Sequence, residues 1–169
     1  MEGEGGAYAA QLAKDKVQGI SSVWDQAMID QFIDLAKKRA PIGSYGTQDL
    51  YQPMEDYRAV AIEGKVTAVL GSERPWVESM LLYYGAKEVT CIEYGEIDSH
   101  VANLKTITPG KYEEYRKKMF EQKKQPQLYD SIWSYSSLEH DGLGRYGDPL
   151  NPYGDMQTMV KKSCMLKPG

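Results

Sequence analysis

The stretch that decides the fold is "KVTAVLGSERPWVESMLLYYGAKEVTCIEY", residues 65–94. It opens with a short β-branched run that ends at Gly71, and it closes with a second such run, "EVTCIEY". Between them, apolar side chains recur at helical spacing, with Pro75 suited to a first helical turn and Gly85 to the position after the last one. A strand, a helix and a strand within about 30 residues predict a right-handed βαβ crossover with parallel strands.

Less regular elements follow this unit. Residues 96–107 are interpreted as a short helix that leads into a weak strand, and residues 111–124 as a charged helix. An apolar run predicts a buried strand at residues 130–135. The glycine- and proline-rich stretch 141–155 predicts a loop without regular structure, and the apolar spacing after it predicts a helix over residues 156–166.

The order of these elements predicts the fold class. Alternating strands and helices are typical of α/β proteins, and we expect a Rossmann-like arrangement of three layers (αβα) around a parallel sheet. Three clear strands and one weak strand are few for such a sheet, and the last strand would leave an apolar edge open. We therefore expect that C-terminal strands are missing and that the open edge allows self-association.

The chain divides into two predicted parts. Residues 1–59 are expected to form an N-terminal helical and loop extension, and residues 60–169 a partial Rossmann domain. Within the extension, apolar residues at helical spacing predict an amphipathic helix from Ser21 up to Pro41. Residues 43–60 are rich in tyrosine and in turn-forming residues and predict mainly loop.

Composition excludes several function classes. A net charge of −4 gives no long-range attraction to nucleic acids or anionic membranes. No apolar run approaches the roughly 20 residues that a membrane-spanning helix needs, and the N-terminus lacks the order of a signal peptide, so we expect a cytoplasmic protein. The two cysteines, Cys91 and Cys164, make no metal-binding spacing and are interpreted as small buried residues; no metal site is predicted.

Several motifs resemble a known family. The strand, loop and helix of the βαβ unit, followed by "GAKEVTCIEY", "YDSIWSYSSLEH" and the terminal "LKPG", resemble the first half of a class I S-adenosylmethionine-dependent methyltransferase. More narrowly, "GSERPWVESMLLYYGAKEVTCIEY" and "SSLEHDGLGRYGDPLNPYGDM" resemble the uncharacterised family called domain of unknown function 268. The resemblance extends from about residue 60 to residue 169. It implies S-adenosylmethionine as cofactor and methyl transfer to an oxygen or nitrogen of a small molecule.

The fold rule and the resemblance together indicate cofactor-binding residues. Ligands of parallel sheets bind at the carboxyl ends of the strands, where the loop of Gly71, Ser72 and Glu73 would meet Glu93. Glu93 lies 22 residues after Gly71, close to the interval at which an acidic residue binds a ribose in dinucleotide-binding units. The resemblance implies that Glu93 accepts hydrogen bonds from the ribose hydroxyls. A surface glutamate at a strand end is the alternative for Glu93, and an exposed loop carboxylate the alternative for Glu73.

The loop after residue 135 supplies the remaining candidates. Ser136 and Ser137 are expected to form hydrogen bonds with the cofactor, and His140 to act as general base or substrate ligand, since its ordinary pKa suits proton abstraction near neutral pH. His140 can equally fix the loop. Arg145 and Asp148 are interpreted as a structural pair or as partners of a substrate charge.

Two other functions stay open. A non-catalytic protein with the methyltransferase fold would explain why "GSERPW" departs from a glycine-rich loop. A nucleotide-binding Rossmann enzyme is disfavoured because the missing second glycine blocks close approach to a pyrophosphate.

Overall fold

The computed structural model describes residues 22–42, 46–144, 148 and 150–168 of the 169-residue chain. Its centre is a four-stranded sheet in the order β5-β3-β2-β6, in which each neighbouring pair is parallel. The strands are β2 (Val66–Leu70), β3 (Glu88–Ile92), β5 (Leu104–Ile107) and β6 (Ser131–Ser134). The predicted Rossmann-like α/β class and the βαβ unit are both confirmed.

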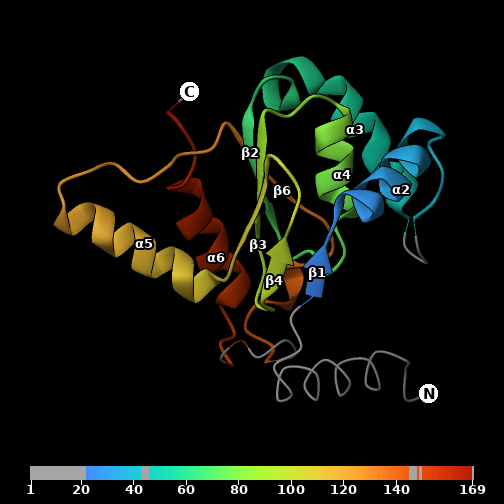
Figure 1. The fold of residues 1–169 in the computed structure, drawn as a ribbon. Helices are drawn as coiled ribbons and strands as arrows, with labels where there is room; N and C mark the ends of the chain where they lie inside the picture. The colour runs from blue at the N-terminus through green and yellow to red at the C-terminus, as the bar shows by residue number, and fades with distance from the viewer. Residues whose placement is uncertain (1–21, 43–45, 145–147, 149, 169) are drawn as a thin grey trace, which may run out of the picture.

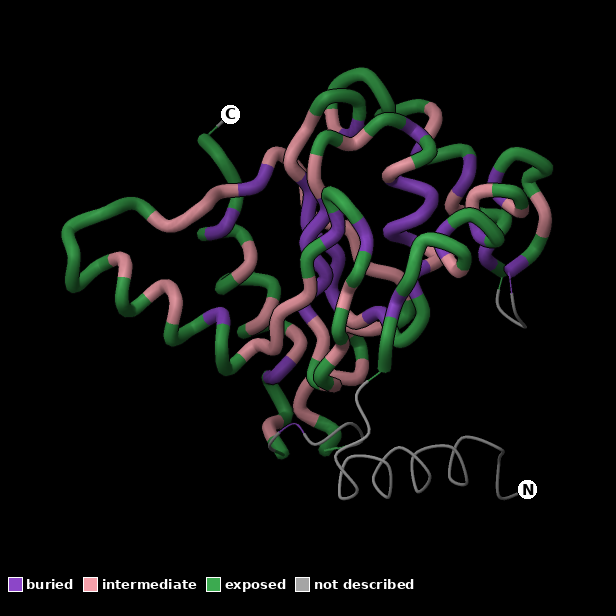
Figure 2. Tube along the Cα trace, in the orientation of Figure 1, coloured by how far each residue is buried: buried purple, intermediate pink, exposed green. Residues whose placement is uncertain are grey.

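The two central strands are apolar because both of their faces are covered. Four of the five residues in β2 and four of the five in β3 are buried, which is the pattern of a parallel strand between two helical layers. Val69 pairs with Cys91 on one side and with Trp133 on the other. The β-branched runs of the sequence therefore form the innermost layer, which is buried apart from the first residue of each strand (Figure 2).

Helices lie on both sides of the sheet (Figure 1). One side carries α2 (Gln26–Lys37), α3 (Tyr51–Asp56) and α4 (Trp76–Tyr83). The other side carries α5 (Pro109–Glu121) and α6 (Gly154–Ser163). Each side has its own apolar cluster, and the cluster on the α4 side is the larger.

Helix α4 is buried on nearly all sides. It lies between the sheet and α2, so the positions that would face solvent in a surface helix are covered as well. Val77, Met80 and Leu81 are buried as the apolar spacing predicts, and Glu78 and Ser79 are buried with them. The layer formed by α2 therefore encloses two polar side chains.

The N-terminal segment differs from its prediction. The helix expected from Ser21 begins at Gln26, capped by Asp25, whose carboxylate accepts a hydrogen bond from Met28 N at 2.9 Å. Before it, Ser22–Trp24 form strand β1. The described part of 43–60 is not a loop, since it contains a short 3-10 helix (Thr47–Leu50), α3 and the start of a π-helical turn (Arg58–Ile62).

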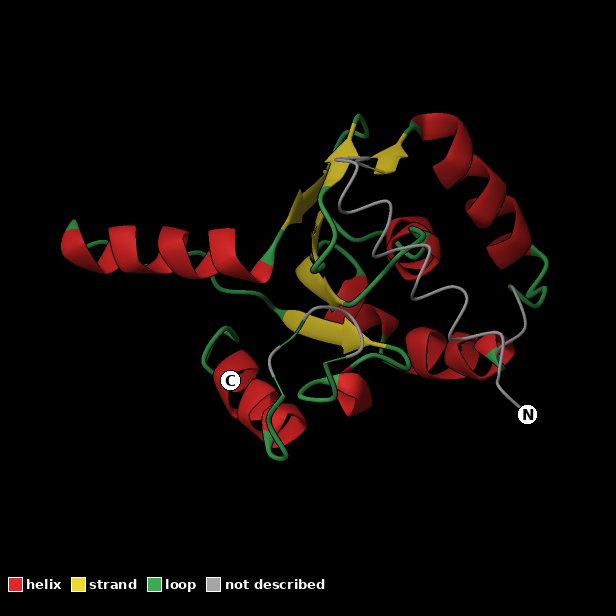
Figure 3. Ribbon diagram, turned by 90° about the horizontal axis from the view of Figure 1, so that it is seen from below, coloured by secondary structure: helices red, strands yellow, loops and turns green. Residues whose placement is uncertain are grey.

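The helix predicted within residues 96–107 is also wrong. Ile97–Ser99 form strand β4, which pairs in parallel with β1. The weak strand predicted in this stretch is confirmed as β5. The pairing joins two segments more than 70 positions apart in the chain and places them beside the carboxyl ends of the central strands (Figure 3).

The outer edge of β6 is partly covered. Tyr129 N donates to Met165 O at 2.8 Å and Lys167 N donates to Tyr129 O at 2.9 Å, so the backbone after α6 lies parallel to the residues just before β6. The Lys167 ammonium contacts the Asp130 carboxylate at 2.9 Å and closes the same junction. Self-association through the remaining edge stays a prediction, as does the domain boundary at residue 60.

Candidate functional site

The candidate site lies where the chain changes direction across the sheet. From β2 the chain crosses through α4 to β3 on one side, while β6 pairs with β2 on the other side. The connections after β2 and β6 therefore lead to helices on opposite faces of the sheet, α4 and α6, and open α/β sheets bind ligands at the carboxyl ends of the strands at such a point. The predicted residues Gly71, Glu93 and Ser136 follow the ends of β2, β3 and β6, respectively.

Gly71 makes a turn in the backbone region that favours glycine. Its φ is +67°, in the left-handed region that favours glycine, and its N–H donates to Ile92 O at 3.0 Å. A Cβ at this position would overlap the Ser137 side chain. The turn therefore brings two predicted site residues, Gly71 and Ser137, into direct contact, and Ser137 fills the space that the missing side chain leaves.

Glu93 occupies the first position after β3. Its N–H donates to Ile107 O at 3.2 Å, and its half-buried carboxylate accepts a hydrogen bond from Gly95 N at 3.2 Å. Glu73 lies in the loop after β2. Partial burial raises the pKa of its carboxyl, the negative charge of Glu93 raises this pKa further, and the positive charge of Arg74 lowers it. The carboxylates of Glu73 and Glu93 are thus close enough for the charge of one to influence the other at the carboxyl ends of the strands.

Acidic side chains from another segment reach the same edge. Burial raises the pKa of the Tyr94 hydroxyl, and the charges of Asp141, Asp148 and Glu93 raise it further. Together with Glu73, these carboxylates come from the loops after β2, β3 and β6. Among the described residues, these carboxylates favour a cationic ligand at the edge over a pyrophosphate.

A buried polar cluster lies beneath the Gly71 loop. The Ser72 hydroxyl donates to Glu78 Oε2 at 3.0 Å, and both side chains are buried. Burial raises the pKa of Glu78 to about 7, the negative charge of Glu93 adds to this, and the neighbouring Glu78 backbone N–H, Cys91 thiol and Ser72 hydroxyl oppose it. The thiol itself donates to Ser72 O at 3.9 Å. Among the described residues, Glu78 Oε1 has no hydrogen-bond partner.

Glu78 is the residue that reasoning from sequence missed. Its signal was a single acidic residue within the otherwise apolar helix "WVESMLLYY". The hydroxyl of Ser72, predicted to bind the cofactor, lies within hydrogen-bond distance of two acceptors, Glu78 Oε2 at 3.0 Å and Arg74 O at 3.3 Å. Direct contact of that hydroxyl with a ligand stays a prediction.

The loop after β6 places the remaining candidates. Ser136 is exposed and has a φ of +51°, and Ser137 accepts a hydrogen bond at its carbonyl from His140 N at 3.0 Å. His140 ends a short 3-10 helix (Leu138–His140), with Nε2 at 3.9 Å from Glu139 Oε1. The backbone bond ties His140 to the serine that touches Gly71, so these three residues lie close together beyond the carboxyl ends of β2 and β6.

The loop predicted at 141–155 is held by Asp148. Its carboxylate accepts hydrogen bonds from Gly142 N at 2.7 Å and Gly144 N at 3.0 Å. The glycines allow close backbone packing, since a Cβ at Gly142 would overlap Asn151 O. Asp148 thus has a structural role; Arg145, its predicted partner, lies outside the described residues.

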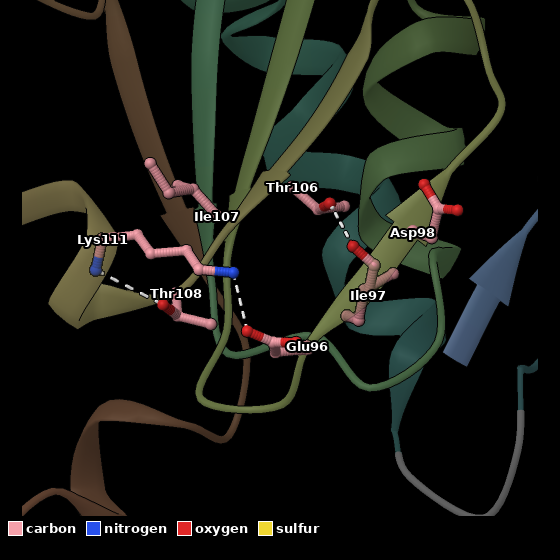
Figure 4. Close-up of a pocket in the computed structure, with 7 residues that line it drawn as sticks. All are labelled: Glu96, Ile97, Asp98, Thr106, Ile107, Thr108 and Lys111. Atoms are coloured by element: carbon pink, nitrogen blue, oxygen red, sulfur yellow. Dashed lines mark hydrogen bonds and ion pairs between the residues drawn. The ribbon is translucent and has the colours of Figure 1, made fainter. Parts of the chain in front are cut away.

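A hollow of about 220 Å³ adjoins the site on the β5 side. It is lined by residues of β4, the end of β5 and the start of α5, and Figure 4 shows Lys111 extending to Glu96 at its rim. The ion pair between Lys111 Nζ and Glu96 Oε1 measures 2.6 Å. Because Ile92 pairs with Ile107, this hollow lies one strand away from Glu93 along the carboxyl edge.

Metal and membrane features are limited in the described part of the chain. No group of three or more His, Cys, Asp or Glu residues there could hold a metal ion. Cys91 is buried as predicted, whereas Cys164 is exposed because it follows the last turn of the thinly covered helix α6. No helix described in the structure has the length and apolar character needed to cross a bilayer.

Most of the chain matches a known protein family. The family model described as "Caenorhabditis protein of unknown function, DUF268" matches residues 64–169. The matched range contains every predicted site residue, from Gly71 to His140. Among curated proteins, none matches the chain.

Proposed function

The chain belongs to the DUF268 family of unknown function, and from this premise we propose that it is an S-adenosylmethionine-dependent methyltransferase-like protein. The proposed reaction is methyl transfer to an oxygen or nitrogen of a small molecule. The observation that carries the proposal is the half-buried Glu93 at the end of β3, held by Gly95 N within an acidic edge beside the Gly71 turn.

The chemistry of these side chains fits the cofactor. A carboxylate accepts hydrogen bonds from two adjacent ribose hydroxyls, and Glu93 is the strand-end residue suited to do so. The acids that surround Tyr94 favour a positive charge at the edge, as a sulfonium and an ammonium would provide. Glu73 is placed in the preceding loop, where its carboxylate is suited to an amino group.

The chain's own residues would align the reactants. S-adenosylmethionine, when bound, supplies an electrophilic methyl group. Ser136 and Ser137 would orient the ligand through hydrogen bonds at the β6 end, and His140 would take the proton of an acceptor hydroxyl or amine. Transfer of this kind depends mainly on alignment and exclusion of water. A small-molecule acceptor would then approach from the β6 side, opposite Glu93.

A second function is supported by one contact. The space left by the missing side chain of Gly71 is filled by Ser137, so the glycine is explained by packing alone. This favours a non-catalytic protein that keeps the fold and binds the cofactor weakly or not at all. A nicotinamide dinucleotide enzyme fits less well, because its pyrophosphate would face Glu73, Glu93 and Asp141.

Calorimetric titration of the 169-residue chain separates these functions. S-adenosylmethionine, S-adenosylhomocysteine and NAD are each titrated into the wild type and into the variants Glu93→Gln and Glu88→Gln. Glu88 lies at the opposite end of the same strand, where it pairs with Lys105 at 2.7 Å, and serves as the matched control.

We expect binding of the two adenosyl ligands and not of NAD, and about a tenfold or greater loss of affinity in Glu93→Gln only, because hydrogen bonds to a charged group contribute about 1.5–3 kcal/mol. Absence of binding to all three ligands would contradict both enzyme functions. Binding of the adenosyl ligands that is insensitive to Glu93→Gln would remove the ribose assignment.

A further inference from the structure

Glu78 is a fully buried carboxyl in the first turn of α4. It lies directly beneath the Gly71 loop, to which it is joined by the Ser72 hydroxyl at 3.0 Å. Its second oxygen, Oε1, has no hydrogen-bond partner among the described residues. Leaving a buried polar atom unpaired costs free energy, and the cost is larger when the group is charged.

The groups around Glu78 define its charge state. From the β2–α4 loop it faces Ser72, from β3 it faces Cys91, and the charge of Glu93 acts on it from the end of β3. Cys91 is itself buried and carries a raised pKa, so its thiol stays protonated. Burial and Glu93 disfavour the carboxylate more than the neighbouring donors favour it, so the pKa of Glu78 lies near 7.

We propose that Glu78 is a positioning residue that fixes the Gly71 loop through Ser72 and that it releases its proton to solvent when a cationic ligand occupies the carboxyl edge. The inference rests on the proposed function, because the cation in question is the sulfonium cofactor. It goes beyond that function by making occupancy of the site depend on the protonation of a residue that the ligand does not touch.

The coupling follows from electrostatics and linkage. A positive charge near Ser72 and Glu93 favours the ionised form of Glu78, so the ligand lowers the pKa of this carboxyl. By reciprocity, the ionised protein binds the cation more tightly than the neutral protein does. Affinity therefore rises with pH up to about 7, the pKa of Glu78 in the free protein, and is constant above it.

The size of the effect depends on the shift that the ligand causes. Each unit by which the bound cation lowers the pKa of Glu78 corresponds to a tenfold gain in affinity between the low-pH and high-pH limits. S-adenosylhomocysteine carries no sulfonium charge and should show a smaller pH dependence. The two ligands differ by one methyl group and one charge, which makes them a matched pair.

Proton release is measured by calorimetry. The wild type is titrated with S-adenosylmethionine at about pH 6, 7 and 8 in two buffers of different ionisation enthalpy, because the difference in heat between buffers counts the protons released. We expect a fractional proton released near pH 6 to 7, less near pH 8, and a smaller release for S-adenosylhomocysteine.

Three variants identify the group. Glu78→Gln keeps the size and an acceptor for Ser72 but cannot ionise, so proton release and the rise in affinity with pH should both disappear. Ser72→Ala should weaken binding while proton release persists. Glu88→Gln should leave both unchanged, because the ion pair with Lys105 holds the pKa of Glu88 below its usual range and it stays ionised.

The outcomes separate this inference from the function on which it rests. Binding of S-adenosylmethionine without proton release, or with a release that Glu78→Gln preserves, would overturn the role of Glu78 and leave the proposed function standing. Absence of binding to the wild type would overturn the proposed function and this inference with it. If Glu78→Gln fails to fold, the heats of the wild type in the two buffers still decide whether a proton is released.

Discussion

The two faces of the sheet are covered to different depths. On one face, α4 is enclosed between the sheet and α2, and Met80 and Leu81 have no exposed surface. On the other face, α6 leaves Met156, Met159 and Val160 more than half exposed. A polar group within the first face has no access to water and must find partners there, whereas one on the second face can be hydrated. The first face therefore contains most of the apolar core. It also contains Glu78, the only fully buried carboxyl among the described residues.

The largest expected effect compares one methionine from each face. Met80→Ala removes a fully buried side chain from a packed helix and should lower the free energy of unfolding by about 2–5 kcal/mol. Met159 is 57% exposed, and Met159→Ala should change the free energy of unfolding by no more than about 0.5 kcal/mol. Urea denaturation measures both changes in the free energy of unfolding, provided that the slope of this free energy against urea concentration is the same in each variant. Equal losses would mean that α6 is covered in solution and that the two faces do not differ.

The second prediction concerns the turn where the loops from β2 and β6 meet. Gly71→Ala adds left-handed strain of about 1–2 kcal/mol and an overlap with Ser137 of about 1–3 kcal/mol. Gly64 has a φ of +70° with no atom within 4 Å of the added Cβ, so Gly64→Ala measures the strain alone.

The additional variant Ser137→Gly should restore the part of the loss that arises from overlap in Gly71→Ala. Denaturation of the two single variants and the double variant gives both contributions. If the double variant is no more stable than Gly71→Ala, the Ser137 side chain does not overlap a Cβ at residue 71 in solution. The space beside Gly71 would then be open to a ligand.

The third prediction tests the buried carboxyl of the deeper face. Because the pKa of Glu78 is about 7 in the folded chain and near 4.5 in the unfolded chain, the folded chain binds more protons between these values. Stability should therefore fall by up to about 3 kcal/mol as pH rises from about 4.5 to 7, and then stay level.

Glu78→Gln should flatten this part of the pH profile, measured by urea denaturation at several pH values. Glu88→Gln is a control of opposite sign, since the pKa of Glu88 is lowered and its contribution is lost only as pH falls below about 4.5. If the free energy of unfolding of Glu78→Gln depends on pH as steeply as that of the wild type, then water reaches the Glu78 carboxyl and this side of the sheet is hydrated.

On the face covered by α4, some elements were predictable from the sequence and others were not. The βαβ unit was predictable because β-branched runs, Pro75 and Gly85 all indicate the same elements. Helix α3 was missed because Pro53 and the tyrosines around it suggest a loop, yet Pro53 lies in the first turn, where its missing N–H costs nothing. Strand β4 was missed because its three residues pair with a distant segment.

The candidate site was predictable in its position and less so in its contacts. Gly71, Glu93 and Ser137 follow strand ends, and strand ends can be read from local pattern. That Ser137 fills the space at Gly71, and that Ser72 turns inward to Glu78, depends on how three loops and α2 pack together. Such packing joins residues far apart in the chain and leaves no local periodicity.

The smallest expected effect compares two aspartates that both pair with lysine. Asp130 accepts a hydrogen bond from Val66 N at 2.8 Å and pairs with Lys167 at 2.9 Å, which joins the segment after α6 to the sheet. Asp34 pairs with Lys37 at 2.9 Å on the exposed side of α2. Asp130→Asn should lower stability by about 0.5–1 kcal/mol, because it removes the charge that pairs with Lys167 while the amide oxygen still accepts from Val66 N, whereas Asp34→Asn should have no measurable effect.

The pH dependence of these variants has a defined sign. The pKa of Asp130 is lowered by its hydrogen bond with Lys167 and then by that from Val66, so its contribution is present above about pH 4 and is lost as pH falls through the folded value. Acid titration of stability should therefore show a shallower decline in Asp130→Asn than in the wild type. A decline that is unchanged would mean that the segment at Lys167 is not held against the sheet, and that the thinner face has even less tertiary structure than α6 suggests.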